Sequence, residues 1–254
     1  MSRMTWAGMI ACALLVLAPV RAAEVSWPLD RANNNLSDDA SLQAGARTFV
    51  NYCLGCHGAA LVRYSALRQI GLTDDQIRDN LMFTAEKIGE MMVTPMTARD
   101  GKEWFGAPPP DLSVVARSRG ADWLYTYMRT FYRDPTTATG WNNAVFPNVA
   151  MPHVLWRLQG ERTLVREPVM RDGKPVGDGH GGTLMTSRFE QIVPGTMTPL
   201  QYDQMIRDLV NFMVWMGEPT QLARRRLGVW VLFGLTVLIF MTYFLYRSYW
   251  KDVH

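Results

Sequence analysis

The chain has little of several things that would point to a specialised class of protein. Its 254 residues include only three cysteines and four histidines, and 19% of the residues are charged. Three cysteines exclude a small domain held together by several disulfides, and this length is enough to bury a hydrophobic core. The formal net charge of +3 is too small to indicate a nucleic-acid-binding protein. Nine tryptophans and 48% hydrophobic residues argue against intrinsic disorder.

The N-terminus has the pattern of a targeting signal. A basic residue, Arg3, is followed by an apolar run over 9–20 and by small residues near Ala22. This order is typical of a secretory signal peptide, and we expect residues 1–22 to be cleaved from the mature protein. A short membrane anchor is the alternative, although the run is shorter than the roughly 20 residues that cross a bilayer.

A second apolar run lies near the C-terminus. Leu227–Tyr246 is twenty residues long without a charge and lies between the triplet Arg224–Arg226 and Arg247. At about 1.5 Å per residue, such a helix spans the roughly 30 Å hydrocarbon core of a membrane. We therefore predict an exported domain over 23–223 and a transmembrane anchor with a short tail over 224–254. The positive-inside rule would place the triplet in the cytoplasm, whereas a cleaved signal peptide predicts the reverse, and we follow the signal peptide.

The domain between these ends is predicted to be mainly α-helical, with long loops. Apolar residues at helical spacing predict helices over 42–57 and 121–133. A third helix is expected to begin at Thr198 as its N-cap, with a proline in the first turn. Prolines and glycines predict loops over 94–111 and 166–182, and little of the sequence has the alternation of a strand.

The strongest motif is C-x-x-C-H over 53–57. It is typical of one covalently attached haem c, in which Cys53 and Cys56 bond to two vinyl groups and His57 ligates the iron. A redox pair would need a thioredoxin-like βαβ context, which the sequence lacks. A structural zinc site needs four ligands and would have to recruit His153 or His180. An ordinary disulfide is the remaining alternative, and it would make the adjacent histidine a coincidence.

Met151 is the best candidate for a second axial ligand. Most of the 16 methionines are expected to pack in the core. Met151 instead lies in a loop-like stretch, with Pro147 before it and Pro152 directly after it. A loop held by prolines can present a thioether to an iron, and a thioether raises the reduction potential relative to a second histidine. The rival ligands are Met96, Met197, His153 and, for a bis-histidine site, His153 or His180.

Taken together, these segments resemble the cytochrome c1 family, the haem subunit of the quinol–cytochrome c oxidoreductase (cytochrome bc1 complex), in its bacterial type. The matching segments are Cys53–His57, Ala107–Ser113 with Arg117 and Arg119 after it, Ala150–Pro152, and Asn211–Pro219 leading into the C-terminal helix. The C-x-x-C-H motif alone is shared by all c-type cytochromes. The proline-rich segment together with the C-terminal anchor makes the resemblance specific.

The resemblance implies a role for each site residue. Cys53 and Cys56 would form the thioether links, His57 would be the proximal ligand and Met151 the distal one. Arg119 would contact a haem propionate, and a propionate inside a protein needs such a charged partner. The alternative for Arg119 is a solvated surface arginine. The proline run 108–110 is expected to form a stiff wall over a haem edge.

The resemblance also implies a function and a setting. The expected fold is a mainly α c-type cytochrome domain with one transmembrane helix, and the expected function is electron transfer from the Rieske iron–sulfur protein to a c-type cytochrome. Cytochrome b would be a partner, the complex would be dimeric, and the haem domain would lie on the periplasmic side of the bacterial inner membrane. The chain would be enzymatic only as a subunit of this oxidoreductase. The alternatives are an independent membrane-anchored cytochrome c that serves a terminal oxidase, and a haem enzyme or sensor with an open iron site.

Charge adds one expectation about the electron acceptor. The predicted signal peptide and the two flanks of the anchor carry a net +6, which leaves the domain between them at −3. A mildly acidic domain attracts a basic partner, and salt screens that attraction.

Overall fold

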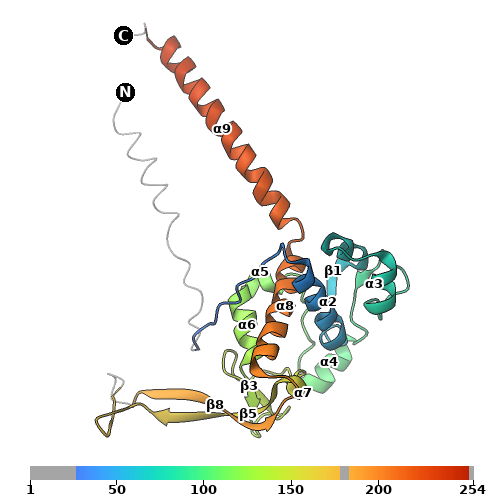
Figure 1. Ribbon diagram of the computed structural model, residues 1–254, viewed down its shortest axis with the longest axis vertical. Helices are drawn as coiled ribbons and strands as arrows, with labels where there is room; N and C mark the ends of the chain where they lie inside the picture. The colour runs from blue at the N-terminus through green and yellow to red at the C-terminus, as the bar shows by residue number, and fades with distance from the viewer. Residues whose placement is uncertain (1–26, 178–182, 252–254) are drawn as a thin grey trace.

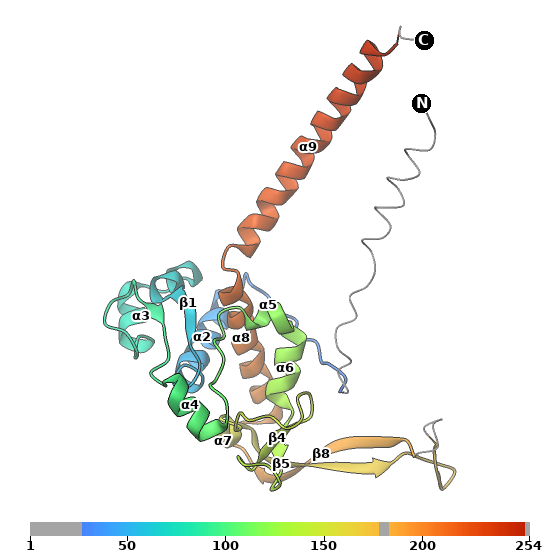
Figure 2. The same ribbon diagram turned by 180° about the vertical axis from the view of Figure 1, so that it is seen from behind.

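The computed structural model describes residues 27–177 and 183–251 as one domain and a long helix that projects from it (Figures 1 and 2). The predicted signal peptide and His180 lie outside the described residues. At the opposite end of the domain from the long helix, a β-hairpin extends sideways in both views.

Three helices form the framework of the domain. Helices α2 (Asp39–Tyr52) and α8 (Pro199–Gly217) lie side by side, with α6 (Ala121–Arg129) against the other side of α8 (Figures 1 and 2). A glycine permits the close approach of the first pair, because a Cβ on Gly45 would lie 2.1 Å from a carbonyl oxygen of α8. The shorter helices are η1 (Tyr64–Ile70), α3 (Asp74–Asn80), α4 (Ala98–Phe105), α5 (Val115–Arg119) and α7 (Trp156–Gln159).

The expected start of α8 is confirmed. The Thr198 hydroxyl accepts a hydrogen bond from the Gln201 amide at 3.3 Å, and the Gln201 side-chain oxygen accepts one from the Thr198 amide at 2.9 Å. This reciprocal pair satisfies two N–H groups that a helix leaves without partners at its first turn. Pro199 follows at the first helical position, where a missing N–H has no consequence.

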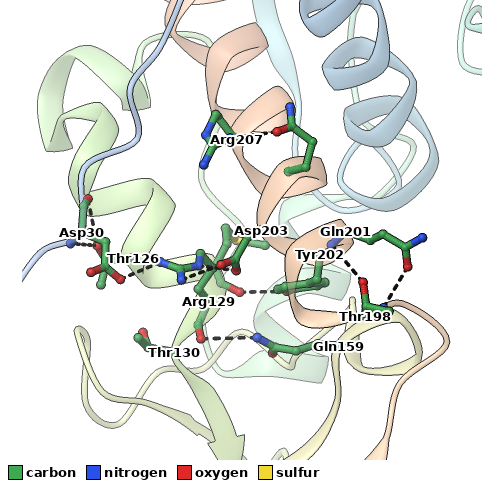
Figure 3. A network of polar contacts seen from close by, with 12 residues as sticks. Asp30, Thr126, Arg129, Thr130, Gln159, Thr198, Gln201, Tyr202, Asp203 and Arg207 are labelled. Atoms are coloured by element: carbon green, nitrogen blue, oxygen red, sulfur yellow. Dashed lines mark hydrogen bonds and ion pairs between the residues drawn. The ribbon is translucent and has the colours of Figure 1, made fainter.

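Arg129 joins the end of α6 to α8 (Figure 3). Its guanidinium bonds to both carboxylate oxygens of Asp203 at 2.6 and 2.9 Å and to Asp30 in the N-terminal segment at 2.6 Å. Beside it, the Tyr202 hydroxyl donates to the Met128 carbonyl at 2.9 Å. Bidentate arginine–carboxylate pairs restrict orientation, so this network fixes how α6 lies across α8.

The strands form four separate two-stranded antiparallel sheets. Their pairs are β1 (Ala59–Arg63) with β2 (Met91–Met92), β3 (Phe131–Arg133) with β4 (Trp141–Asn143), β5 (Gly160–Pro168) with β8 (Met185–Pro194), and β6 (Met170–Arg171) with β7 (Lys174–Pro175). The β5–β8 pair is the hairpin that projects from the domain (Figures 1 and 2). The domain remains mainly helical, as expected, with more strand than its sequence predicts.

Several predicted boundaries are wrong, each for a physical reason. The first helix ends at Tyr52, so the haem-binding motif forms a turn after the helix. The second ends at Arg129, because Phe131–Arg133 pairs instead with a strand ten residues further along the chain. The expected loop over 166–182 contains the end of β5 together with β6 and β7, whose pairing depends on non-local contacts. The expected loop over 94–111 contains α4, with its N-cap at Thr97.

Helix α9 (Gln221–Tyr249) contains the whole predicted membrane span. Within the described residues it is long and apolar enough to cross a membrane, and its apolar side chains are exposed. The first arginine of the triplet is held near the domain: the Arg224 guanidinium bonds to Glu218 at 2.5 and 3.1 Å. Arg117 approaches the same carboxylate at 3.6 Å. The start of the long helix is thereby linked to the domain.

Candidate functional site

The C-x-x-C-H motif forms a tight turn directly after α2. The amides of Cys56 and His57 both donate to the Cys53 carbonyl, at 3.0 and 2.8 Å. The Cys53 thiol is buried and the Cys56 thiol partly buried, and neither is in a disulfide. Burial, together with the neighbouring Cys56, raises the pKa of Cys53 to about 12. A redox C-x-x-C pair depends on a lowered thiol pKa, so this environment argues against thiol–disulfide exchange.

His57 is held in the form that binds a metal. Its Nδ1 lies 2.8 Å from the carbonyl oxygen of Pro110, which accepts the Nδ1–H. The lone pair of Nε2 is then available for a ligand, as in metal sites whose histidine is oriented by a second hydrogen bond. Burial lowers the pKa of His57, and this keeps the imidazole neutral.

The proline-rich segment is fastened beside the motif. The Leu112 amide donates to the Gly58 carbonyl at 2.7 Å, and one carboxylate oxygen of Asp111 accepts from the Ala60 amide at 2.7 Å. The Ser113 hydroxyl accepts from the Leu61 amide at 3.0 Å. These bonds place the Pro110 carbonyl within hydrogen-bonding distance of His57. Asp111 and Ser113 therefore serve to fix the proline-rich segment against the residues that follow the motif.

A mostly apolar cavity of about 320 Å³ adjoins the motif. This volume lies in the range of pockets for cofactors and other small molecules, roughly 300–1,000 Å³. The lining includes both cysteines, His57, Met151, Arg119, the segment 107–110, Trp123, Tyr127, Phe146, and Leu209 and Met213 from α8. Helices α2, α6 and α8 and two loops thus enclose one space.

Met151 reaches this cavity on a loop that a buried asparagine holds in place. The Asn143 side-chain amide donates to the Tyr127 carbonyl of α6 at 2.7 Å, while its oxygen accepts from the amides of Val145 and Phe146 at 2.9 and 3.1 Å. The Tyr127 hydroxyl donates to the Met151 sulfur at 3.4 Å. Neither Tyr127 nor Asn143 was singled out from the sequence, because a tyrosine in an apolar helical stripe looks like core packing.

The three rival ligands among the described residues lie outside this cavity. His153 is buried, stacked on Phe131 with ring centroids 4.8 Å apart and edge-on to Trp141 at 5.1 Å. Burial lowers the pKa of His153 to about 3, so its ring is a neutral part of the core. Met96, Met197 and His153 are not among the residues that line the cavity. In the described part of the chain, no group of three or more metal-binding side chains of the zinc type comes together.

Arg119 lines the cavity and is otherwise exposed. Its guanidinium carbon lies 5.1 Å from the ring centroid of Trp123 and 5.9 Å from that of Phe146. A guanidinium held over aromatic faces keeps its N–H groups free for an anion. The position therefore suits a carboxylate of a ligand in the cavity.

These residues fit a haem c. The cavity offers an apolar space for a flat macrocycle, two thiols in one turn, a neutral imidazole with Nε2 available, a thioether, and a guanidinium for a carboxylate. His57 and Met151 are far apart in sequence, and the fold brings both to the same space. Nitrogen and thioether donors of this kind ligate haem iron in electron carriers.

Comparisons with known proteins agree with this fit. The profile of the Cytochrome C1 family matches residues 27–162 and 185–253. A protein of Nitrosomonas europaea named ammonia monooxygenase gamma subunit is 47% identical over 226 residues, covering 89% of each chain. Cytochrome c1 of Allochromatium vinosum is 42% identical over 249 residues, covering 97% of this chain and 99% of its own. Cytochrome c1 of Rhodospirillum rubrum is 28% identical, covering 85% and 83%. Between its two matched segments the profile leaves out residues 163–184, which include most of β5 together with β6 and β7.

Proposed function

The chain belongs to the cytochrome c1 family, the haem-bearing electron-transfer subunit of the bc1 complex, and from this premise we propose how its own residues perform that transfer. Cys53 and Cys56 hold the haem c covalently, His57 is the proximal ligand and Met151 the distal ligand. The observation that carries the proposal is that all four of these side chains line one mostly apolar cavity.

When bound, haem c supplies a one-electron couple, and the protein residues set its potential and keep water away. The neutral His57 ring is oriented by the Pro110 carbonyl, 2.8 Å away, which strengthens its donor nitrogen. The thioether of Met151 favours the reduced state relative to a second histidine. If His57 and Met151 both ligate the iron, no coordination position would remain for a substrate, which an open-site enzyme or sensor would need.

Arg119 pairs with a haem propionate in this proposal. Its guanidinium lines the cavity and is restrained over Trp123 and Phe146. An ion pair at this position compensates the negative charge of a carboxylate that is partly removed from water. Replacing Arg119 by glutamine should lower the reduction potential, because the unpaired propionate then stabilises the ferric state.

The same proposal includes the partners and the location. The donor is the Rieske iron–sulfur protein, the acceptor is a c-type cytochrome, and cytochrome b accompanies them in a dimeric complex. Helix α9 anchors the chain once in the bacterial inner membrane, with the haem domain in the periplasm. The net charge of −3 on the domain supports a basic acceptor, and raising the salt concentration should slow electron transfer to it.

A redox titration followed in the near infrared tests the ligation. The purified full-length chain should show the charge-transfer band of methionine bound to ferric haem, and Met151→Leu should abolish the band and lower the potential. Met96→Leu is the matched control, because Met96 does not line the cavity. A band that persists in Met151→Leu would refute the distal ligand.

Purification from host membranes in mild detergent tests the partners. We expect the chain to copurify with a dihaem cytochrome b and an iron–sulfur protein. Because the chain is also similar to a protein named as a monooxygenase subunit, the alternative outcome is copurification with such an enzyme. Copurification with monooxygenase subunits, and without cytochrome b, would make the chain an electron carrier for that enzyme instead.

A further inference from the structure

Tyr127 contacts the sulfur atom to which the proposed function assigns the distal position. Its hydroxyl oxygen lies 3.4 Å from the Met151 sulfur, and both side chains line the cavity. The tyrosine is 8% exposed, so its hydroxyl is removed from bulk water and depends on a protein acceptor. Among the described residues, the acceptor that the structure provides is the methionine sulfur.

The direction of this hydroxyl is determined by packing. The Tyr127 ring is stacked on Trp123 with centroids 4.8 Å apart and planes 11° apart, and it makes a T-shaped contact with Phe131, with centroids 5.1 Å apart. The Tyr127 carbonyl accepts from the Asn143 amide at 2.7 Å. Ring and backbone are thus both held, and the hydroxyl oxygen is fixed beside the Met151 sulfur.

The same ring system holds the loop that carries Met151. Phe131, which packs against Tyr127, is also stacked on His153 at 4.8 Å with planes 4° apart. His153 follows Met151 by two residues. The hydroxyl and the sulfur are therefore placed by a continuous aromatic cluster and share one rigid support, so their approach is a property of the fold.

A thioether sulfur has two lone pairs, so it can ligate a metal with one and accept a hydrogen bond with the other. A hydrogen bond to the sulfur withdraws electron density from it. A poorer donor stabilises the ferric ion less than the ferrous ion, because the higher charge depends more on electron donation from its ligands. The bond therefore raises the reduction potential, and it weakens the hold of the sulfur on the ferric ion more than on the ferrous ion.

We propose that Tyr127 is a positioning residue for Met151: the Tyr127 hydroxyl orients the thioether and raises the reduction potential of the site. This inference rests on the proposed function, in which Met151 is the distal ligand. It assigns a role in the electron-transfer reaction to a residue that packing alone would explain as part of the core.

The test compares Tyr127→Phe with Tyr125→Phe in the haem-loaded full-length chain. Both changes remove one hydroxyl from a buried tyrosine on α6, but Tyr125 does not line the cavity and its ring lies 4.5 Å from the Arg129 guanidinium carbon. The measurements are the reduction potential, the position of the methionine–iron charge-transfer band, and the rate at which added imidazole displaces methionine from the ferric protein.

We expect Tyr127→Phe to lower the equilibrium constant for reduction about threefold to tenfold, where tenfold corresponds to 59 mV for one electron. It should also shift the band and slow the displacement of methionine from the ferric protein, because a sulfur without the hydrogen bond donates more electron density to the ferric ion. Tyr125→Phe should change none of these. A purely structural role would alter the unfolding midpoint and leave the potential and the band in place. That result, or a Tyr127→Phe protein identical to wild type, overturns the inference.

The ligation by Met151 and the role of Tyr127 are distinguished by different outcomes. If the wild-type protein lacks the charge-transfer band, the assignment of Met151 as ligand is wrong, and the role of Tyr127 falls with it. If the band is present and Tyr127→Phe leaves the potential, band and displacement rate unchanged, the ligand assignment stands and the inference about Tyr127 alone is wrong.

Discussion

Gly45 is the position where one added methyl group should disturb the domain most directly. It lies on α2 where this helix meets α8, and a Cβ there would be 2.1 Å from the Asp208 carbonyl oxygen and 2.6 Å from the Phe212 Cβ. Both neighbours belong to the opposite helix and its core face, so neither can turn aside as a flexible side chain would. Gly45→Ala therefore requires the two helices to separate.

The size of the effect follows from two opposing terms. Overpacking a well-packed contact lowers the free energy of unfolding by about 1–3 kcal/mol, and a clash with backbone lies at the upper end of that range or above it. Alanine is intrinsically better than glycine within a helix by about 1 kcal/mol, which offsets part of the loss. We expect a net loss of about 2 kcal/mol, which corresponds to a fall in Tm of roughly 4–8 °C for a domain of this size.

The assay is urea denaturation of the haem-loaded full-length chain in detergent, followed by far-ultraviolet circular dichroism. Gly228→Ala in α9 is the matched control, because nothing lies within 4 Å of a Cβ built there. The separation should also disturb the cavity, since α2 leads directly into Cys53 and α8 contributes Leu209 to the lining. A Gly45→Ala protein as stable as wild type would refute the close packing of α2 on α8.

Three other predictions concern the ion pairs, caps and loop contacts of the domain. The Arg133 guanidinium, 2.7 and 2.9 Å from Glu161, holds the pKa of that carboxyl below its ordinary value of 4.5. The pair stabilises the fold above pH 4.5 and loses its effect as the pH falls through the lower folded pKa. Glu161→Gln should thus lower the free energy of unfolding by less than about 1 kcal/mol at pH 7. The difference from wild type in urea titrations should vanish once the pH lies below the lowered pKa of Glu161. Thr198→Ala removes an N-cap and should lower the same free energy by about 1 kcal/mol without changing the haem spectrum; an altered spectrum would contradict this. Asn143→Ala leaves a helix carbonyl and two loop amides without their buried partner. It should lower the free energy of unfolding by at least about 2 kcal/mol and weaken the methionine charge-transfer band. An unchanged band would show that the position of Met151 does not depend on this asparagine.

The features that the sequence predicted well depend on short stretches of chain. Thr198 and Gln201 identify the start of α8, because a capping box involves residues three apart. The C-x-x-C-H spacing indicates haem attachment, because both thiols and the histidine must meet one macrocycle. The uncharged run 227–246 predicts a spanning helix, because crossing a membrane requires length and apolarity alone.

The features that it missed depend on pairing between distant segments. Strands β5 and β8 pair Leu164 with Phe189 across a connection that looks like a plain glycine-rich loop. In the same way, Phe131–Arg133 continues a helical pattern and yet forms a strand, because Trp141–Asn143 pairs with it. Local propensity is a weak preference, and such tertiary contacts override it.

The candidate site likewise combines features set by local sequence with features set by contacts between distant segments. The sequence by itself predicted that Cys53, Cys56 and His57 act together, since covalent and coordinate bonds to one macrocycle would leave little freedom in spacing. Only the tertiary structure separated Met151 from His153, two residues apart, by turning one into the cavity and the other into a stack with Phe131. It alone also brought the Tyr127 hydroxyl to the Met151 sulfur, because that contact exists only once α6 and the loop are packed together.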